Sequence, residues 1–173
     1  MARDLIRVGR LSLSKSLPHH AEAIADDLRL HDLRECLIYG LRPLEALTEP
    51  LAIHGAKTYT IKLDDSPIAM CGSVPLDQSG ARIWMLGTSG ITNNFRPFLR
   101  GCADAIDLLH SDYEYIENYV PADHHETIMW LSWCGFTFDD VTYDICGHTM
   151  MRFVRCREKH KGVIAELTRP VMH

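Results

Sequence analysis

The residues best placed to do chemistry lie where an apolar run ends in front of a helix. Trp84–Thr88 is a strand-like segment whose apolar part stops at Gly87, and the loop Ser89–Asn94 leads into a long helical pattern. Open α/β sheets usually bind ligands at such a strand end, where a helix N-terminus offers N–H groups to an anion. This stretch therefore predicts both the core and the site of the molecule.

Other polar residues have a more ordinary explanation. The adjacent pairs His19-His20 and His124-His125 lack the i, i+4 spacing of a helical metal site, so solvated helix N-termini explain them. Asp123 and Glu126 have the spacing of an N-cap and its capping-box partner. The sequence contains no nucleophile elbow, Walker loop or dinucleotide fingerprint. We assign no metal ligand and no catalytic residue from these patterns.

The elements that position the site follow the order strand, helix, strand, helix. The first helix carries apolar residues three and four apart, which share one face: Phe95, Phe98, Leu99, Cys102, Ile106 and Leu109. Tyr115–Val120 is the next strand, and a short helix then ends at Trp133–Phe136. A crossover helix of this length favours parallel pairing of the two strands. The fold class is α/β.

The rest of the chain indicates helices first and strands later. The expected elements are a strand within Ile6–Leu13, helices from Ser16–Pro18, over His31–Tyr39 (stopped by Gly40) and over Arg42–Leu47 ahead of Pro50, a hairpin of Tyr59–Leu63 with Ile68–Val74, a strand over Ile83–Thr88, and strands over Val141–Ile145 and His148–Val154. We expect one domain over residues 1–156. A charged tail over residues 157–173 lacks clear periodicity.

Composition limits the possible partners. The 173 residues fit one domain, and the net charge of −5 argues against direct nucleic-acid binding. No apolar run approaches the ~20 residues of a membrane span, and the N-terminus lacks a secretory signal. The six cysteines form no CxxC pair, which favours reduced thiols used as small apolar residues. We therefore expect synthesis in the cytoplasm and no membrane contact.

The helix that closes the central unit, Ile128–Phe136, ends in the pair Gly135-Phe136. It resembles the last helix of the GNAT acetyltransferase superfamily, whose element order is also that of this chain. The resemblance implies a GNAT-like mixed sheet around the strand-helix-strand-helix unit, with helices packed on both faces. It also makes acetyl-CoA a possible cofactor.

A second set of residues runs in order from about Ala25 to Phe153: Asp27–Arg29, Asp32, Glu35, Gly40, Pro43, Ala46-Leu47, Pro67–Gly72, Trp84–Thr88, Phe98–Arg100, Glu117–Val120 and Trp130–Phe136. In these residues the chain resembles a small family of tailed-phage proteins, acetyltransferase-like in fold and associated with internal virion proteins or head assembly in short-tailed phages. The resemblance implies a virion location after synthesis in the host cytoplasm. The implied partners are internal core, portal or head proteins.

The superfamily motif for the coenzyme A pyrophosphate, Gln/Arg-x-x-Gly-x-Gly/Ala, is poorly matched. The corresponding loop, Thr92–Phe98, has no paired glycines, and Pro97 lacks an N–H. Arg96 or Arg100 could compensate in part by charge, or both could be ordinary solvated helix residues. The superfamily often uses a tyrosine of the last helix as general acid. Alignment on Gly135-Phe136 puts Leu131 there, and leucine cannot donate a proton.

Superfamily members accept the pantetheine arm between two splayed strands. Leu86, Gly87, Thr88 and Asn118 would line that notch here, and with Arg96 they are the cofactor-binding candidates if acyl-CoA binds. Gly87 could mark close approach by a ligand or simply end a strand. Asn118 could instead satisfy a backbone group in the notch.

The leading hypothesis is a non-catalytic, acetyltransferase-like virion or virion-assembly protein, with no cofactor expected and homo-oligomers possible. The alternative is an active or residual N-acetyltransferase that uses acetyl-CoA. A second alternative is a phage protein that binds a host target.

Overall fold

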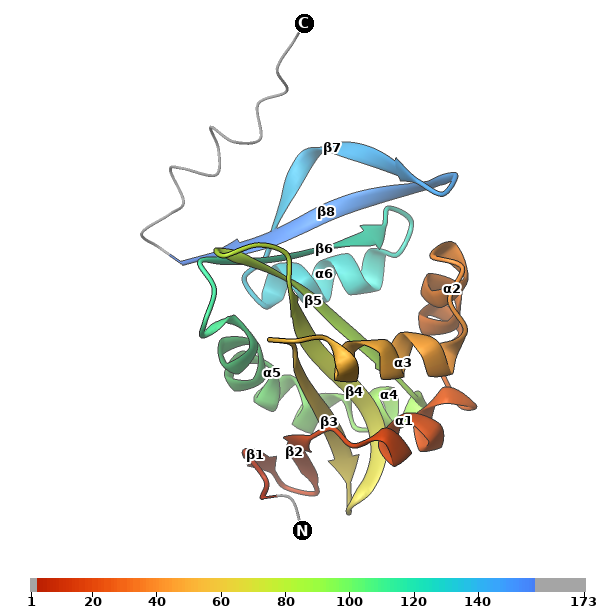
Figure 1. Ribbon diagram of the computed structural model, residues 1–173, viewed down its shortest axis with the longest axis vertical. Coiled ribbons are helices and arrows are strands. Elements are labelled where there is room, and N and C mark those ends of the chain that lie inside the picture. Colours follow the sequence, from red (N-terminus) through yellow and green to blue (C-terminus); the bar gives the residue numbers. More distant parts are fainter. Residues whose placement is uncertain (1–2, 158–173) are drawn as a thin grey trace, which may run out of the picture.

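The computed structural model describes residues 3–157, which form an eight-stranded sheet with helices on both faces (Figure 1). The elements are β1 (Ile6–Val8), β2 (Leu11–Lys15), α1 (Pro18–Ala25), α2 (Leu30–Ile38), α3 (Pro43–Ala52), β3 (Lys57–Leu63), β4 (Ser66–Pro75), β5 (Gly80–Gly87), α4 (Ser89–Asn93), α5 (Phe95–His110), β6 (Tyr115–Pro121), α6 (His125–Trp133), β7 (Thr137–Ile145) and β8 (His148–Cys156). The strand order is β1-β2-β3-β4-β5-β6-β8-β7.

The central unit has the predicted pairing. β5 and β6 are parallel, and every other neighbouring pair in the sheet is antiparallel. The connection between β5 and β6 runs through α4 and α5, as a parallel pair requires. The tail expected from residue 157 falls, apart from Arg157, outside the described residues. No helix within residues 3–157 is long and apolar enough to cross a membrane.

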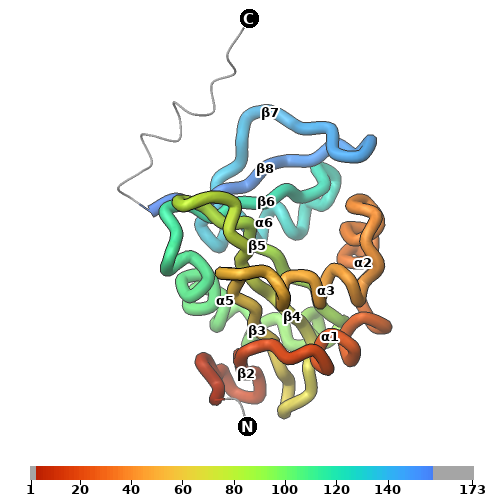
Figure 2. Tube along the Cα trace, viewed as in Figure 1, coloured from red at the N-terminus to blue at the C-terminus, as the bar shows by residue number. Residues whose placement is uncertain are grey.

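Each face of the sheet has its own core. On one face, α5 and α6 bury side chains such as Ile106 and Leu131 against Ile116 of β6. On the other face, α1 and α3 bury Ile24 and Leu47 against β4 and β5. Figure 2 shows that α1 and α3 lie over the β3–β5 part of the sheet, whereas β6, β8 and β7 extend beyond them. The predicted mixed sheet with helices on both faces is confirmed.

Two local predictions near the N-terminus were wrong. The single strand expected within Ile6–Leu13 is a hairpin of β1 and β2, because the chain reverses at Gly9, whose φ of +61° suits glycine. The helix expected to end before Pro50 continues through it to Ala52. Proline there lies in the last turn, where it removes one main-chain hydrogen bond and leaves buried Leu47 in place.

His20 is not the solvated residue that the sequence indicates. Its side chain is 2% exposed, and its Nδ1 accepts a hydrogen bond from Leu17 N at 3.1 Å and lies 2.9 Å from Thr60 Oγ1. Burial, followed by the charges of Lys62 and His19, lowers the pKa of His20 to about 4. A neutral imidazole therefore fixes the start of α1 to β3.

This burial predicts acid sensitivity. The unfolded chain takes up a proton at His20 below about pH 6.5, whereas the folded chain does so only near pH 4, so the contribution of His20 to stability rises with pH between these values. The loss on acidification is roughly up to 3 kcal/mol. Urea unfolding at pH 4–7 should show His20→Gln losing less stability on acidification than the wild type, by this amount. The exposed control His19→Gln should follow the wild type, and the same pH dependence in all three proteins would contradict the assignment.

Candidate ligand site between β5 and β6

The two parallel strands separate soon after they pair. Their register covers only Gly80–Arg82 with Tyr115–Glu117, whereas β5 stays paired with β4 as far as Gly87. We call the gap beyond Arg82 the β5–β6 fork. Thr88 N donates to Ile68 O, so the main-chain groups of Thr88 point toward β4. Main-chain groups of successive strand residues point to opposite sides, so those of the even-numbered β5 residues also face β4 and those of the odd-numbered residues face the fork. Those residues are Ile83, Met85 and Gly87.

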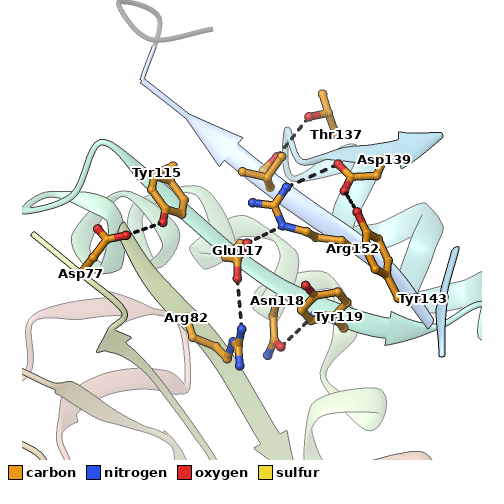
Figure 3. A network of polar contacts seen from close by, with 11 residues as sticks. Asp77, Arg82, Tyr115, Glu117, Asn118, Tyr119, Thr137, Asp139, Tyr143 and Arg152 are labelled. Atoms are coloured by element: carbon orange, nitrogen blue, oxygen red, sulfur yellow. Dashed lines mark hydrogen bonds and ion pairs between the residues drawn. The ribbon is translucent and has the colours of Figure 1, made fainter. Parts of the chain in front are cut away.

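Asn118 closes the narrow end of the fork. Its Nδ2 donates to Ile83 O at 2.7 Å. Its Oδ1 accepts from Tyr119 N at 2.8 Å, and Figure 3 shows this second contact. One side-chain amide thus satisfies a carbonyl of β5 and an N–H of β6 where the ladder between them stops. This is the backbone-satisfying role considered for Asn118 from the sequence.

The segment that enters α2 closes the wide end. Gly87 N donates to Asp32 Oδ2 at 2.9 Å, and Gly87 O accepts from Arg29 N at 2.9 Å. Asp32 is 3% exposed and also accepts from Arg29 Nε at 2.8 Å. Of the three β5 residues whose main-chain groups face the fork, only Met85 has an N–H and a C=O without a hydrogen-bond partner among residues 3–157.

A cavity of about 660 Å³ passes through the fork. Its walls are mainly apolar side chains of the sheet, α5 and α6, including Phe98, Leu131 and Phe153. On the α5–α6 side the rim carries Phe95, Met129 and Trp133, which are 47%, 72% and 62% exposed. Where α2 faces the start of α6, the lining is polar: Arg29, His31, Asp32, Glu35, His124 and Glu126.

The polar side holds an acid that is hard to ionise. Burial, and then the charge of Asp32, raises the pKa of Glu35 to about 8, although Arg29 and Arg34 oppose the shift. Glu35 is therefore mostly protonated at neutral pH. The Asp32 carboxylate is balanced by the Arg29 guanidinium, at 2.8 Å. Within residues 3–157, no group of three or more His, Cys, Asp or Glu could hold a metal ion.

Two contacts join α2 to the start of α6 across the fork. Arg34 donates to both carboxylate oxygens of Asp123, at 3.1 and 3.0 Å, and the His31 and His124 rings are 4.6 Å apart. Burial lowers the pKa of His31. The N-cap predicted at Asp123 was wrong, because its carboxylate binds Arg34 and the helix begins after His124, with no side-chain cap.

The expected loop before α5 is instead the short helix α4, capped by Thr88. Gly90 N donates to Thr88 Oγ1 at 3.2 Å, and Ile91 N to Thr88 O at 3.2 Å. A Cβ at Gly90 would meet Ile68 Cγ2 at 2.8 Å, so this glycine permits contact with β4. Phe98 N donates to Asn94 O, and Pro97 has no N–H. Few N–H groups remain here for an anion.

The structure does not gather the five cofactor-binding candidates around the cavity. Asn118 lines it, whereas Leu86 is buried in the core with α1 and α3. Gly87 and Thr88 are bonded to α2 and β4 as described, and Arg96 is exposed, with no ion pair within residues 3–157. Contact of these residues with a cofactor stays a prediction.

Sequence reasoning missed the chemical role of the α2 residues. Arg29, Asp32 and Glu35 entered only through a family resemblance. A local signal exists, because Asp32 and Glu35 lie three apart and next to buried Cys36, on the face of α2 that turns inward. Leu131, aligned with the usual general acid, is 5% exposed and lines the cavity.

Comparison with known proteins identifies the fold. No protein-family model and no curated protein sequence matches the chain. A solved structure described as a putative acetyltransferase matches with TM-score 0.66 and 11% identity, covering 96% of both chains. A GNAT-family acetyltransferase from Bacillus anthracis matches with TM-score 0.66 and 10% identity over 87% of this chain and 97% of its own. A spermidine N-acetyltransferase chimera of Vibrio cholerae SpeG and hSSAT matches with TM-score 0.63 and 10% identity, covering 88% of this chain and 98% of its own. At such identities the likeness shows the fold alone, and that fold is the GNAT acetyltransferase fold.

Proposed function

We propose that the chain is a non-catalytic protein with an acetyltransferase fold, which acts by binding as a component or assembly factor of a tailed-phage particle. One observation carries the non-catalytic part. The β5 edge in the fork is occupied by the protein's own groups, Asn118 at Ile83 and Arg29 with Asp32 at Gly87. Within residues 3–157, an added strand-like ligand finds free main-chain groups on the fork side of β5 only at Met85.

The residues present do not fit coenzyme A. A diphosphate needs several convergent N–H groups or cations, and the N–H groups of Gly90 and Ile91 in α4 are already bonded to Thr88. The space beside Gly87 is occupied by Ala69, and the space beside Gly90 by Ile68, so neither glycine leaves room for a ligand. Leu131 offers no proton for a departing thiolate. These features support the non-catalytic part of the proposal.

The phage part rests on the sequence resemblance between about Ala25 and Phe153. It makes other virion proteins of the core, portal or head the proposed partners, and the virion the proposed location after synthesis in the host cytoplasm. A homo-oligomer is compatible with this role. The net charge of −5 supports protein rather than nucleic-acid partners.

Calorimetric titration with acetyl-CoA tests the non-catalytic part. We expect no saturable heat up to about millimolar ligand. A dissociation constant of about 1 mM corresponds to a binding free energy of only about 4 kcal/mol, so anything weaker is not specific recognition of the cofactor. An active GNAT enzyme in the same buffer is the positive control. A micromolar dissociation constant would instead support the alternative function.

Mass spectrometry of purified virions tests the phage part. We expect peptides of the chain in particles at a fixed ratio to a known head protein. Their absence from particles, with the chain present in infected cells, would favour the second alternative, a protein that binds a host target.

One observation favours the enzymatic alternative, an active or residual N-acetyltransferase. Glu35 lines the cavity, and its pKa of about 8 lies close to neutral pH, which is the condition for proton transfer by a side chain. The acetyl-CoA titration decides between the two functions, because the enzyme must bind its cofactor and the proposed binding protein does not.

A further inference from the structure

We infer that the β5–β6 fork binds an extended apolar segment of a partner protein, which pairs with Met85 as a short added strand. This inference rests on the proposed function and names the chemistry of the partner. It follows from three features of the fork: its free main-chain groups, its apolar rim and its balanced charges.

The main chain fixes where a strand can be added. Met85 presents both its N–H and its C=O to the cavity, and the neighbouring positions Ile83 and Gly87 are already bonded. Strand addition at a sheet edge uses main-chain pairs of this kind. The free edge is one residue long, so one residue of a peptide can pair with β5.

The apolar surface extends from the cavity to solvent. Phe95, Met129 and Trp133 line the cavity and are exposed at its α5–α6 rim. Aromatic and methionine side chains are enriched at protein interfaces, and tryptophan is a frequent hot spot. The side chains of an entering segment would therefore bury apolar area on the rim as well as inside.

Charge favours an uncharged segment. Asp32 is balanced by Arg29, and the raised pKa leaves Glu35 mostly neutral. A purely aliphatic ligand would leave the Met85 N–H and C=O unpaired in an apolar site, at a cost of about 1–3 kcal/mol. A peptide satisfies both groups, which is why we choose it over a lipid chain.

The test uses the full chain and a randomised library of N-acetylated hexapeptide amides as the probe. We expect selected peptides to be apolar and to bind with micromolar dissociation constants. N-methylation at the pairing position should weaken binding at least tenfold, since it removes one main-chain bond. Methylation at the next position, whose N–H faces away, is the matched control.

Two substitutions locate the site. Met129→Asp, on the exposed rim, should weaken the selected peptide at least fivefold. Leu37→Asp, on the exposed face of α2 and 68% exposed in the wild type, should leave binding unchanged. A library without binders, binding that N-methylation does not affect, or equal effects of the two substitutions would overturn the inference.

Other occupants are separate outcomes. A benzophenone side chain at residue 129 should cross-link to the selected peptide. Cross-links formed without peptide, to a second copy or to residues 158–173, would overturn the choice of occupant. Absence of peptide binding together with a silent acetyl-CoA titration rejects this inference alone, whereas acetyl-CoA binding rejects the proposed function.

Discussion

Replacement of Asp32 by alanine is expected to lower the free energy of unfolding by about 3–5 kcal/mol. The carboxylate is 3% exposed and accepts from Gly87 N and from the Arg29 guanidinium. Alanine would leave the Arg29 side chain, 15% exposed, without its counter-charge, and the Gly87 N–H without its acceptor. Removing one partner of a buried pair costs far more than an exposed ion pair contributes.

Urea unfolding at pH 7 measures this effect, with Asp27→Ala as the matched control because Asp27 is exposed in the preceding turn. Asp32→Asn keeps an acceptor for Gly87 N but loses the charge, so its cost should fall between the two. A loss below about 1 kcal/mol in Asp32→Ala would show that α2 does not fasten the β5 edge.

Replacement of Glu35 by glutamine is expected to stabilise the protein at alkaline pH. The unfolded chain ionises Glu35 near pH 4.5, whereas the folded chain does so only near pH 8. At Glu35 the folded state therefore binds more protons between these values, and the contribution of this carboxyl to wild-type stability falls as pH rises through them. At pH 9 the gain in Glu35→Gln should be about 2–4 kcal/mol, discounted for the water that reaches a partly exposed side chain.

Thermal and urea unfolding from pH 4 to 9 check this sign. The wild type and Glu35→Gln should agree at pH 4, where the carboxyl is protonated in both states, and diverge above pH 5. Glu49→Gln, at an exposed position of α3, is the control and should follow the wild type. If the stability of Glu35→Gln stays at a constant difference from that of the wild type at every pH, the pKa of Glu35 is not raised by folding.

Local patterns were enough to predict the central unit. The three-and-four spacing from Phe98 to Leu109 does place a buried face on α5, and Tyr115–Val120 is a strand parallel to β5. Glycine also marked real turns, since Gly40 and Gly135 have φ of +67° and +89° where helices end. Such features depend on residues close in sequence, so a single chain reveals them.

The closure of the fork could not be predicted, because its partners are distant in sequence. Asp32 binds Gly87 across 55 positions, and His20 meets Thr60 across 40. No period or cap signals these pairs. A distant partner also explains Asp123. Its sequence context predicts a helix cap, but its carboxylate binds Arg34, 89 positions away.

Amide hydrogen exchange resolved by NMR tests most directly whether the protein's own groups close the fork. Gly87 and Tyr119 donate to the side chains of Asp32 and Asn118, whereas Met85 N–H faces the cavity without a partner within residues 3–157. We predict that Met85 exchanges at least about 100-fold faster than the other two amides. Equal protection of all three, or fast exchange at Gly87, would contradict the closed fork.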